Sequence, residues 1–279
     1  MFEQPDSDHL RRIDVRQWKV SIALNDPAAL TLDRPIGVFV HLFYEDLADE
    51  IARYLALIAL PKQIYVSTTS EEKKLEIRRT FDRYSLDAPV QISIVPNRGR
   101  DIAPLLIEFG TSMRQHDICL KLHGKRSLHT PDGFGDGWRS YLYSELIGTT
   151  ERVRSIVHTM TVNRGLGVVL PQHYADVQPY IGIGPNYELM QRILAKISLR
   201  LLPDQEIEFP SGSMFWFRSE ALVRLSDLGL DWPDFGDSPD ARDGTLSHAI
   251  ERCILFFCAH AGKKWAFLPS SARSGTLQQ

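Results

Sequence analysis

Two short basic segments each follow an apolar run that is typical of a buried strand. Asn97-Arg98-Gly99-Arg100-Asp101 follows residues 90–95, and His123-Gly124-Lys125-Arg126-Ser127 follows residues 118–122. In a parallel sheet such turns lie at the edge where ligands bind, outside the carboxyl ends of the strands. Guanidinium and ammonium groups at this edge suit a diphosphate, so the pattern predicts a site for a nucleotide-activated substrate. The residues expected to bind it are Arg98, Arg100, Lys125, Arg126 and Ser127; the alternative for the cations is pairing with surface carboxylates.

The remaining polar residues near these turns are expected to shape the site. Asn97 and Gly99 form the first turn, where glycine permits a positive φ and the close approach of a ligand. Asp101 either caps the helix that follows or contacts the base or sugar of the substrate. His123 and His41 each end an apolar run. An imidazole there either contacts phosphate and orients the substrate or is a satisfied structural group.

A candidate catalytic carboxylate, Asp243, stands just before the last predicted helix, residues 245–261. Gly244 gives the backbone the freedom to present this side chain to a cleft. Within hydrogen-bond reach of an acceptor hydroxyl, the carboxylate would serve as a general base. The alternative is an N-cap of the helix, a position that aspartate suits well.

Two segments, residues 138–139 and 209–216, combine aromatic side chains with polar neighbours and are candidate sugar-stacking platforms. Because residues 213–218 are also predicted to form a buried strand, at least one of Phe215 and Trp216 must belong to the core. The residues of these segments that we expect to bind substrate are Trp138, Arg139, Ser211, Gly212 and Trp216.

Strand-like runs alternate with helical spacing along most of the chain. This pattern predicts an α/β protein whose mostly parallel, doubly wound, Rossmann-like sheet forms a single domain. Strands are expected at 36–42, 63–67, 90–95, 118–122, 167–171 and 213–218, and helices at 46–60, 102–114, 138–147, 151–162, 186–201, 219–228 and 245–261. An N-terminal arm or edge element is placed at 1–34, the domain at 35–265 and a tail at 266–279. The irregular stretch 172–185 is a candidate lid or acceptor loop.

The composition excludes several classes of protein. A net charge of -3 over 279 residues does not favour a nucleic-acid binder, which needs a basic field. The sequence contains no phosphate-binding Gly-x-x-x-x-Gly-Lys-Ser/Thr, no Gly-x-Gly-x-x-Gly and no Gly-x-Ser-x-Gly motif. Its three cysteines indicate a reducing compartment, and no apolar run approaches the ~20 residues that span a bilayer. We therefore expect a cytoplasmic protein, at most peripheral to the inner membrane.

In several segments the sequence resembles the rhamnan synthesis protein F family, over roughly residues 35–265. The segments that carry the resemblance are 40–44, 65–68, 97–104, 122–127, 138–139, 209–216 and 243–252. The resemblance implies a GT-A-like glycosyltransferase of bacterial rhamnose-containing polysaccharide and lipopolysaccharide synthesis. The layout is also similar to that of the inverting family 2 transferases, in which a later acidic segment supplies the base, here Asp243.

The chain departs from that plan where those transferases hold a metal ion with an Asp-x-Asp motif. Leu122-His123-Gly124-Lys125 stands at this place. We therefore expect no metal or other cofactor. Fixed side-chain cations would take the role of the metal ion, and the need for a divalent metal stays open.

The resemblance and the basic turns together predict an inverting transfer from a nucleoside diphosphate sugar, with dTDP-L-rhamnose as the implied donor. The acceptor would be a glycan, lipid-linked at the inner membrane face, where other glycosyltransferases would be partners. Asp243 and His123 are the expected catalytic residues. The alternative function is a non-catalytic subunit that binds a nucleotide sugar or glycan and assists a partner transferase.

Overall fold

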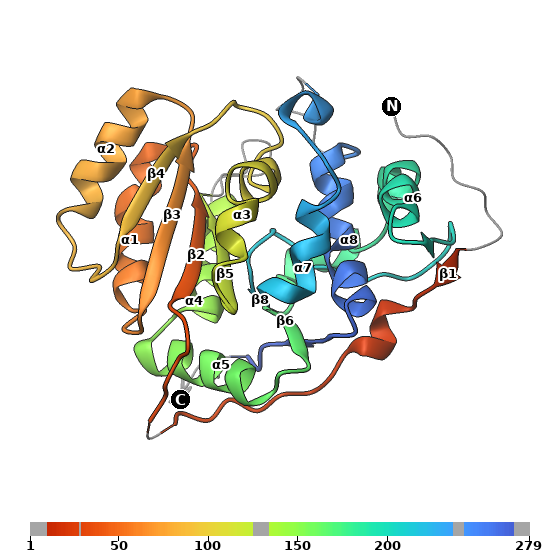
Figure 1. Cartoon of the computed structure of the whole chain (residues 1–279), viewed down its shortest axis with the longest axis horizontal. Coiled ribbons are helices and arrows are strands. Elements are labelled where there is room, and N and C mark those ends of the chain that lie inside the picture. Colours follow the sequence, from red (N-terminus) through yellow and green to blue (C-terminus); the bar gives the residue numbers. More distant parts are fainter. Residues whose placement is uncertain (1–9, 28, 125–133, 237–242, 271–279) are drawn as a thin grey trace, which may run out of the picture.

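The computed structural model describes residues 10–27, 29–124, 134–236 and 243–270. Its described part is built around a seven-stranded sheet with the strand order β4-β3-β2-β5-β8-β6-β9 (Figure 1). The strands are β2 (Ile36–His41), β3 (Lys62–Thr68), β4 (Val90–Ile94), β5 (Ile118–His123), β6 (Leu166–Leu170), β8 (Phe215–Arg218) and β9 (Lys264–Phe267). A separate parallel pair joins β1 (Arg11–Arg12) to β7 (Leu199–Arg200).

Helices cover both faces of the sheet. The α-helices are α1 (Ala48–Ala56), α2 (Glu71–Phe81), α3 (Gly110–Met113), α4 (Phe134–Leu146), α5 (Thr150–Val162), α6 (Tyr187–Ala195), α7 (Ser219–Ser226) and α8 (Leu246–His260). One core packs α1, α2, α4 and α5 on one face, and a second core packs α3, α6, α7 and α8 on the other. The predicted α/β class, with one doubly wound and mostly parallel sheet, is confirmed.

The strands form because short apolar runs bury side chains on both faces, as expected for a parallel sheet under two helical layers. In β2, Val38 and Val40 belong to the core under α1, whereas Phe39 belongs to the core under α8. Phe39 stacks there on Tyr65 of β3, with ring centroids 5.0 Å apart. The alternation of faces follows from the two-residue period of a strand.

One strand runs against the others. β8 is antiparallel to both of its neighbours, β5 and β6, while β6 and β9 are parallel. The amino end of β8 therefore lies beside the carboxyl end of β5, with Phe215 opposite Lys121. This reversal brings the preceding residues, 211–213, to the edge where the parallel strands end.

Several elements differ from their predicted extents. The helix expected at 102–114 is a π-helical turn, Pro104–Glu108, followed by α3; the Phe109 N–H donates to the Pro104 carbonyl five residues earlier. The helix expected at 186–201 ends at Ala195, because Ser198 takes a positive φ of 58° and the chain then enters β7. The irregular stretch 172–185 contains two 3-10 turns, Ala175–Tyr180 and Gly184–Asn186.

The N-terminal segment packs against the carboxyl half of the domain. Val15, in the 3-10 turn Val15–Trp18, is fully buried in the core with α8. The Trp265 indole N–H donates to the Val15 carbonyl at 2.7 Å. The proposed boundaries at 34 and 265 stay predictions.

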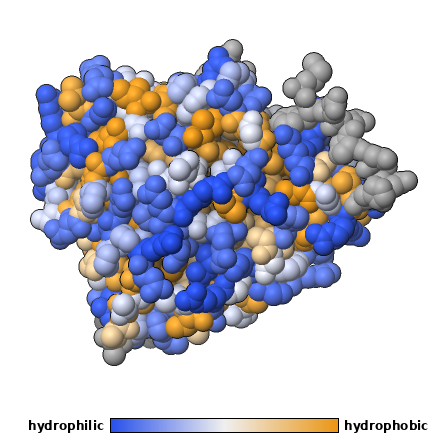
Figure 2. All heavy atoms as spheres, viewed as in Figure 1, coloured by the Kyte–Doolittle hydropathy of each residue, from blue (hydrophilic) through white to orange (hydrophobic). Residues whose placement is uncertain are grey.

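Within the described residues, no helix has both the length and the apolar character required to cross a bilayer. Hydrophilic residues form a band across the middle of the face drawn in Figure 2. The large apolar residues exposed among those described are Leu75, Ile94, Val162 and Tyr180.

Trp216 corrects one expectation from the sequence. Its side chain is fully buried in β8, and its indole N–H donates to the Leu146 carbonyl at 2.9 Å. Phe215, its neighbour, is equally buried on the opposite face. Both aromatic side chains belong to the core, so Trp216 has no surface to offer a sugar ring.

We expect Trp216→Ala to lower the free energy of unfolding by about 3–5 kcal/mol, because it leaves a large cavity and an unpaired Leu146 carbonyl. Trp216→Phe should lower it less, because the ring still fills most of the space. Urea unfolding measures both values. Near-wild-type stability of the alanine variant would contradict the core position.

Candidate functional site

The carboxyl ends of β2 and β5 form the centre of the candidate site. β3 and β4 follow β2 on one side, whereas β5 lies on its other side, so the strand order reverses between β2 and β5. Such a switch point is where open α/β sheets bind ligands. The register pairs His41 of β2 with His123 of β5, which places two predicted residues side by side.

His41 is held in its neutral form. Its Nδ1 atom lies 2.9 Å from the Ser67 hydroxyl at the end of β3. Burial lowers the pKa of His41 to about 4, and the charges of Lys121 and Lys73 act in the same direction, against the charge of Asp101. A neutral imidazole can accept or donate one hydrogen bond to a ligand without adding charge to the edge.

His123 is buried and fixes the turn that precedes β8. Its Nε2–H donates to the Gly212 carbonyl at 2.8 Å, and its own carbonyl accepts from the Tyr143 hydroxyl at 2.8 Å. Gly212 has a φ of +86°, and a Cβ there would lie 2.7 Å from Leu142. Through these contacts, the predicted site residues His123 and Gly212 both position the turn that precedes β8.

A buried ion pair lies beneath this edge. Lys121 of β5 is fully buried, and its ammonium group pairs with Asp101 and donates to the Ser213 carbonyl at 2.7 Å and the Ser213 hydroxyl at 2.8 Å. Burial raises the pKa of Asp101, but the charges of His123 and Lys121 outweigh it and hold that pKa well below its usual range. Asp101 therefore anchors its turn to the sheet and is not the N-cap of the turn Pro104–Glu108, whereas its contact with a ligand stays a prediction.

Sequence reasoning did not include Lys121 among the site residues. The signal that could have found it is a lysine in the otherwise apolar run Ile118–His123. A charged side chain that is buried in a strand requires partners, since an isolated buried charge is very costly. Its partners come from residues 101 and 213, so only the fold identifies them.

The first basic turn has the left-handed backbone that its glycine predicts. Gly99 has a φ of +67°, and a Cβ there would come within 2.7 Å of Ala103 and Phe235. Arg100 also takes a positive φ, 53°, which is uncommon for a residue with a side chain. Asn97 and Arg100 are exposed and Arg98 is half-buried, so these side chains lie at the surface of the edge.

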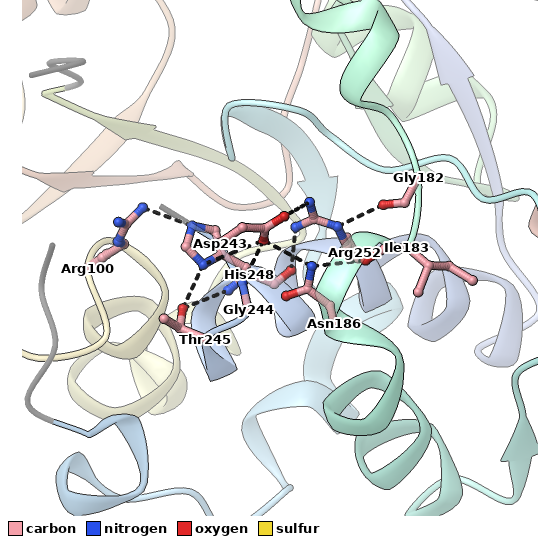
Figure 3. A network of polar contacts seen from close by, with 9 residues as sticks. All are labelled: Arg100, Gly182, Ile183, Asn186, Asp243, Gly244, Thr245, His248 and Arg252. Carbon is pink, nitrogen blue, oxygen red and sulfur yellow. Dashed lines mark hydrogen bonds and ion pairs between the residues drawn. The ribbon is translucent and has the colours of Figure 1, made fainter. Parts of the chain in front are cut away.

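A second polar network joins this turn to the start of α8 (Figure 3). The Arg100 guanidinium donates to His248 Nε2 at 3.0 Å, and His248 Nδ1 lies 2.7 Å from the Thr245 hydroxyl. The arginine contact requires an unprotonated Nε2 and assigns the proton to Nδ1. Burial, with help from the charge of Arg100, lowers the pKa of His248 to about 4.

Asp243 lies in this same network. Its Oδ1 accepts from Asn186 Nδ2 and from the Gly244 N–H, each at 2.9 Å, and its Oδ2 accepts from Arg252 at 3.0 Å. The side chain keeps 32% of its surface exposed, so a substrate can still reach the carboxylate. Thr245, and not Asp243, is the N-cap of α8, because its hydroxyl accepts from the His248 N–H. The capping alternative for Asp243 is therefore wrong.

The other predicted residues have structural partners. Ser211 is buried, and its hydroxyl lies 2.8 Å from His173 Nδ1. Arg139 is buried on α4 and pairs with Glu50 at 2.8 Å and Asp136 at 2.7 Å, which ties α4 to α1; its binding of a sugar stays a prediction. Trp138 is half-buried and lies against Gly212. Lys125, Arg126 and Ser127 lie outside the described residues.

The described residues contain no group of three or more His, Cys, Asp and Glu side chains that could hold a metal ion. At the place of the Asp-x-Asp motif, the carboxylate near His123 is that of Asp101, which already pairs with Lys121. This donor set does not fit a divalent cation, and the chemistry below uses none.

Replacing Lys121 by Met should lower the free energy of unfolding by about 3–5 kcal/mol, because it leaves the Asp101 carboxylate buried without its counter-ion. The double variant Lys121→Met/Asp101→Asn should lose less than the sum of the two single variants. Chemical denaturation of all four proteins gives the coupling energy. Additive losses would show that the two groups do not interact.

Acid should weaken the fold through His41. The pKa of His41 is about 4 in the folded protein, whereas the ordinary value of 6.5 applies to the unfolded chain. Between pH 4 and 6.5 the unfolded chain therefore binds more protons than the folded protein does. The free energy of unfolding therefore falls as the pH falls through this window, by about 2 kcal/mol at pH 5. His41→Asn should reduce the slope of stability against pH between 7 and 5; an unchanged slope would contradict the neutral imidazole.

A family model described as rhamnan synthesis protein F matches residues 19–263. Two curated proteins from strains of Xanthomonas campestris pv. campestris, both named uncharacterized protein WxcX, are 33% identical over 229 residues, which is 81% of this chain and 32% of theirs. The chain thus spans about a third of the length of these relatives.

Two solved structures are distantly similar. A mycobacterial protein matches over 68% of this chain and 55% of its own at 14% identity, with a TM-score of 0.38. L-sorbose reductase from Gluconobacter frateurii matches over 88% of this chain and 98% of its own at 14% identity, with a TM-score of 0.28. Both scores are too low to support a conclusion about this chain.

Proposed function

Because the chain belongs to the rhamnan synthesis protein F family, we propose that it is a glycosyltransferase of bacterial surface polysaccharide synthesis. The proposed reaction transfers a sugar from a nucleoside diphosphate donor to a growing glycan with inversion at the anomeric carbon. The proposed donor is dTDP-L-rhamnose.

The observation that carries this proposal is the contact between Arg100 and His248. These residues are 148 positions apart, and their 3.0 Å contact joins the basic turn after β4 to the segment that holds Asp243. This contact supports the proposal that a cation for the diphosphate and a carboxylate for the proton belong to one site. Sugar transfer needs both, since the leaving group gains negative charge while the acceptor hydroxyl loses its proton.

The donor diphosphate would bind at the edge formed by the turn 97–101. Arg98 and Arg100 supply fixed positive charge there, and Lys125 and Arg126 are proposed to add to it. Preorganised cations stabilise the departing diphosphate more strongly than they stabilise the bound ground state. The buried pair of Lys121 and Asp101 keeps the turn in place, so the cations need no rearrangement during the reaction.

Asp243 is the proposed general base. It takes the proton of the acceptor hydroxyl as the oxygen attacks the anomeric carbon, and the bond from that carbon to the diphosphate breaks with its electron pair leaving on the diphosphate. Arg252 and Asn186 hold the carboxylate in one orientation. His123 would act as a positioning residue, through its hydrogen bond to Gly212.

The proposed acceptor is a lipid-linked glycan at the inner face of the membrane, where the chain would work beside other glycosyltransferases. A peripheral place at the membrane is proposed with the acceptor.

Asp243→Asn should abolish transfer while donor binding stays measurable, because the amide keeps the shape of the side chain but cannot take a proton. Transfer is measured by release of the nucleoside diphosphate in the presence of acceptor, and binding by calorimetric titration of the donor. Asp227→Asn, in a surface pair with Arg114, is the matched control and should transfer normally. Full activity of Asp243→Asn would remove this residue from the mechanism.

One observation favours the alternative, a non-catalytic subunit that binds a nucleotide sugar or glycan. Both carboxylate oxygens of Asp243 already accept hydrogen bonds from the protein, one from Asn186 and the other from Arg252, which gives the side chain a structural role that needs no catalysis. Donor binding without transfer or hydrolysis, for the wild type and for every acceptor tried, would support the subunit. Turnover without added metal would support the transferase.

A further inference from the structure

We propose that a groove on the far side of Asp243 from the basic turn binds the acceptor glycan, an inference that rests on the proposed function. Residues 181–184 with Tyr187 form one wall and residues 203–208 the other, and Arg16 reaches it from the N-terminal segment. Its volume of about 650 Å³ lies in the range of small-molecule sites and is sufficient for a short oligosaccharide.

The groove reaches the proposed base. The Gly182 carbonyl accepts from Arg252 at 2.9 Å, and Arg252 holds Asp243 (Figure 3). A Cβ added to Gly184 would lie 3.3 Å from Asp243 Oδ2, so the backbone of this wall lies directly against the carboxylate. A ligand at this end of the groove would therefore lie beside the wall that contacts the proposed proton acceptor.

One stretch of chain connects the groove to the donor edge. Residues 204–208 line it, and the same stretch of chain continues into residues 211–213, which hold His123 and Lys121. Glu208 accepts from His173 Nε2 at 2.8 Å, and His173 Nδ1 lies 2.8 Å from the Ser211 hydroxyl. One segment thus forms a wall of the groove and positions the switch point.

The chemistry of the lining suits an uncharged, hydroxyl-rich ligand. Asp204, Glu206 and Glu208 place three carboxylates against the single guanidinium of Arg16, which already pairs with Glu206. This excess of negative charge repels a diphosphate, whereas carboxylates accept hydrogen bonds from sugar hydroxyls. Ile181, Ile183 and the Tyr187 ring add the apolar surface on which a sugar face can pack.

Two buried acceptors beside the groove have no partner among the residues that the structure describes. They are Gln205 Oε1, in a lining residue, and Asn186 Oδ1, next to Tyr187 and bonded through its Nδ2 to Asp243. Both side chains are more than nine-tenths buried. Because an unpaired buried acceptor costs free energy, a hydrogen-bond donor that reached Gln205 Oε1 from the groove would be favoured.

The test uses Gly182→Trp. A Cβ at Gly182 meets no atom within 4 Å and its backbone is not left-handed, so the fold accepts a large side chain that takes space in the groove. Gly165→Trp is the matched control, since a Cβ there also meets nothing within 4 Å and the residue is exposed outside the groove. A second variant, Asp204→Ala/Glu206→Ala, removes two exposed carboxylates and keeps the shape of the groove.

The probe is a rhamnose trisaccharide, titrated into each protein by calorimetry without donor. We expect Gly182→Trp and Asp204→Ala/Glu206→Ala to weaken its binding by about tenfold or more, the loss of one or two hydrogen bonds. Gly165→Trp should bind like the wild type, and all four proteins should bind dTDP-L-rhamnose equally. Wild-type affinity for the trisaccharide in both groove variants, or competition by the nucleoside diphosphate alone, would overturn the proposal.

The two proposals fail in different ways. If the wild type bound the trisaccharide in the groove but neither bound nor consumed the donor, the glycosyltransferase function would be contradicted and the glycan site confirmed. If the wild type transferred sugar and Gly182→Trp kept the wild-type KM for the acceptor, the groove proposal would be contradicted and the function kept.

Discussion

The buried ammonium group of Lys121 is the constraint on which the candidate site depends. It lies in β5 without access to water, so its charge must be met by protein atoms, and those atoms come from the turn at Asp101 and from Ser213. Satisfying one lysine therefore fixes three segments against each other: the end of β5, the basic turn after β4 and the approach to β8. The backbone of Arg98 and Arg100, in the same turn, is held in place by these contacts.

From that anchor, the polar contacts extend in two directions. Towards the sheet, His123 holds the Gly212 carbonyl, and its register partner His41 contacts Ser67. Towards α8, Arg100 contacts His248, and Asp243 is held by Arg252 and Asn186. The two histidines at the ends of these contacts, His41 and His248, both have a pKa lowered to about 4 by burial. With these two imidazoles neutral, they add no positive charge to that of Lys121 and the arginines.

The separation of positive and negative side chains gives the donor and the acceptor different places in the proposed site. Positive side chains lie on the turn 97–101, three carboxylates lie in the groove beyond Asp243, and Asp243 lies between them. The carboxylates of the groove would repel an anionic donor. The basic turn would hold a hydroxyl-rich, uncharged acceptor poorly. The antiparallel strand β8 makes the arrangement possible, because its direction carries residues 204–213 from the groove to the switch point.

The sequence alone determined the class of fold and the edge at which its polar turns gather. Both follow from local patterns: apolar runs with strand period alternate with helical spacing, and the turns after parallel strands share one edge. It also identified Gly99, whose left-handed backbone follows from its place in the turn. Only the tertiary structure decided what the side chains do there. Trp216 and Arg139 became structural, and Lys121, His248 and Asn186 joined the site. Each has a partner that lies between 20 and 148 residues away along the chain. Contacts at that separation depend on the direction of β8 and on the packing of α8 against the sheet, and no local period of residues encodes them.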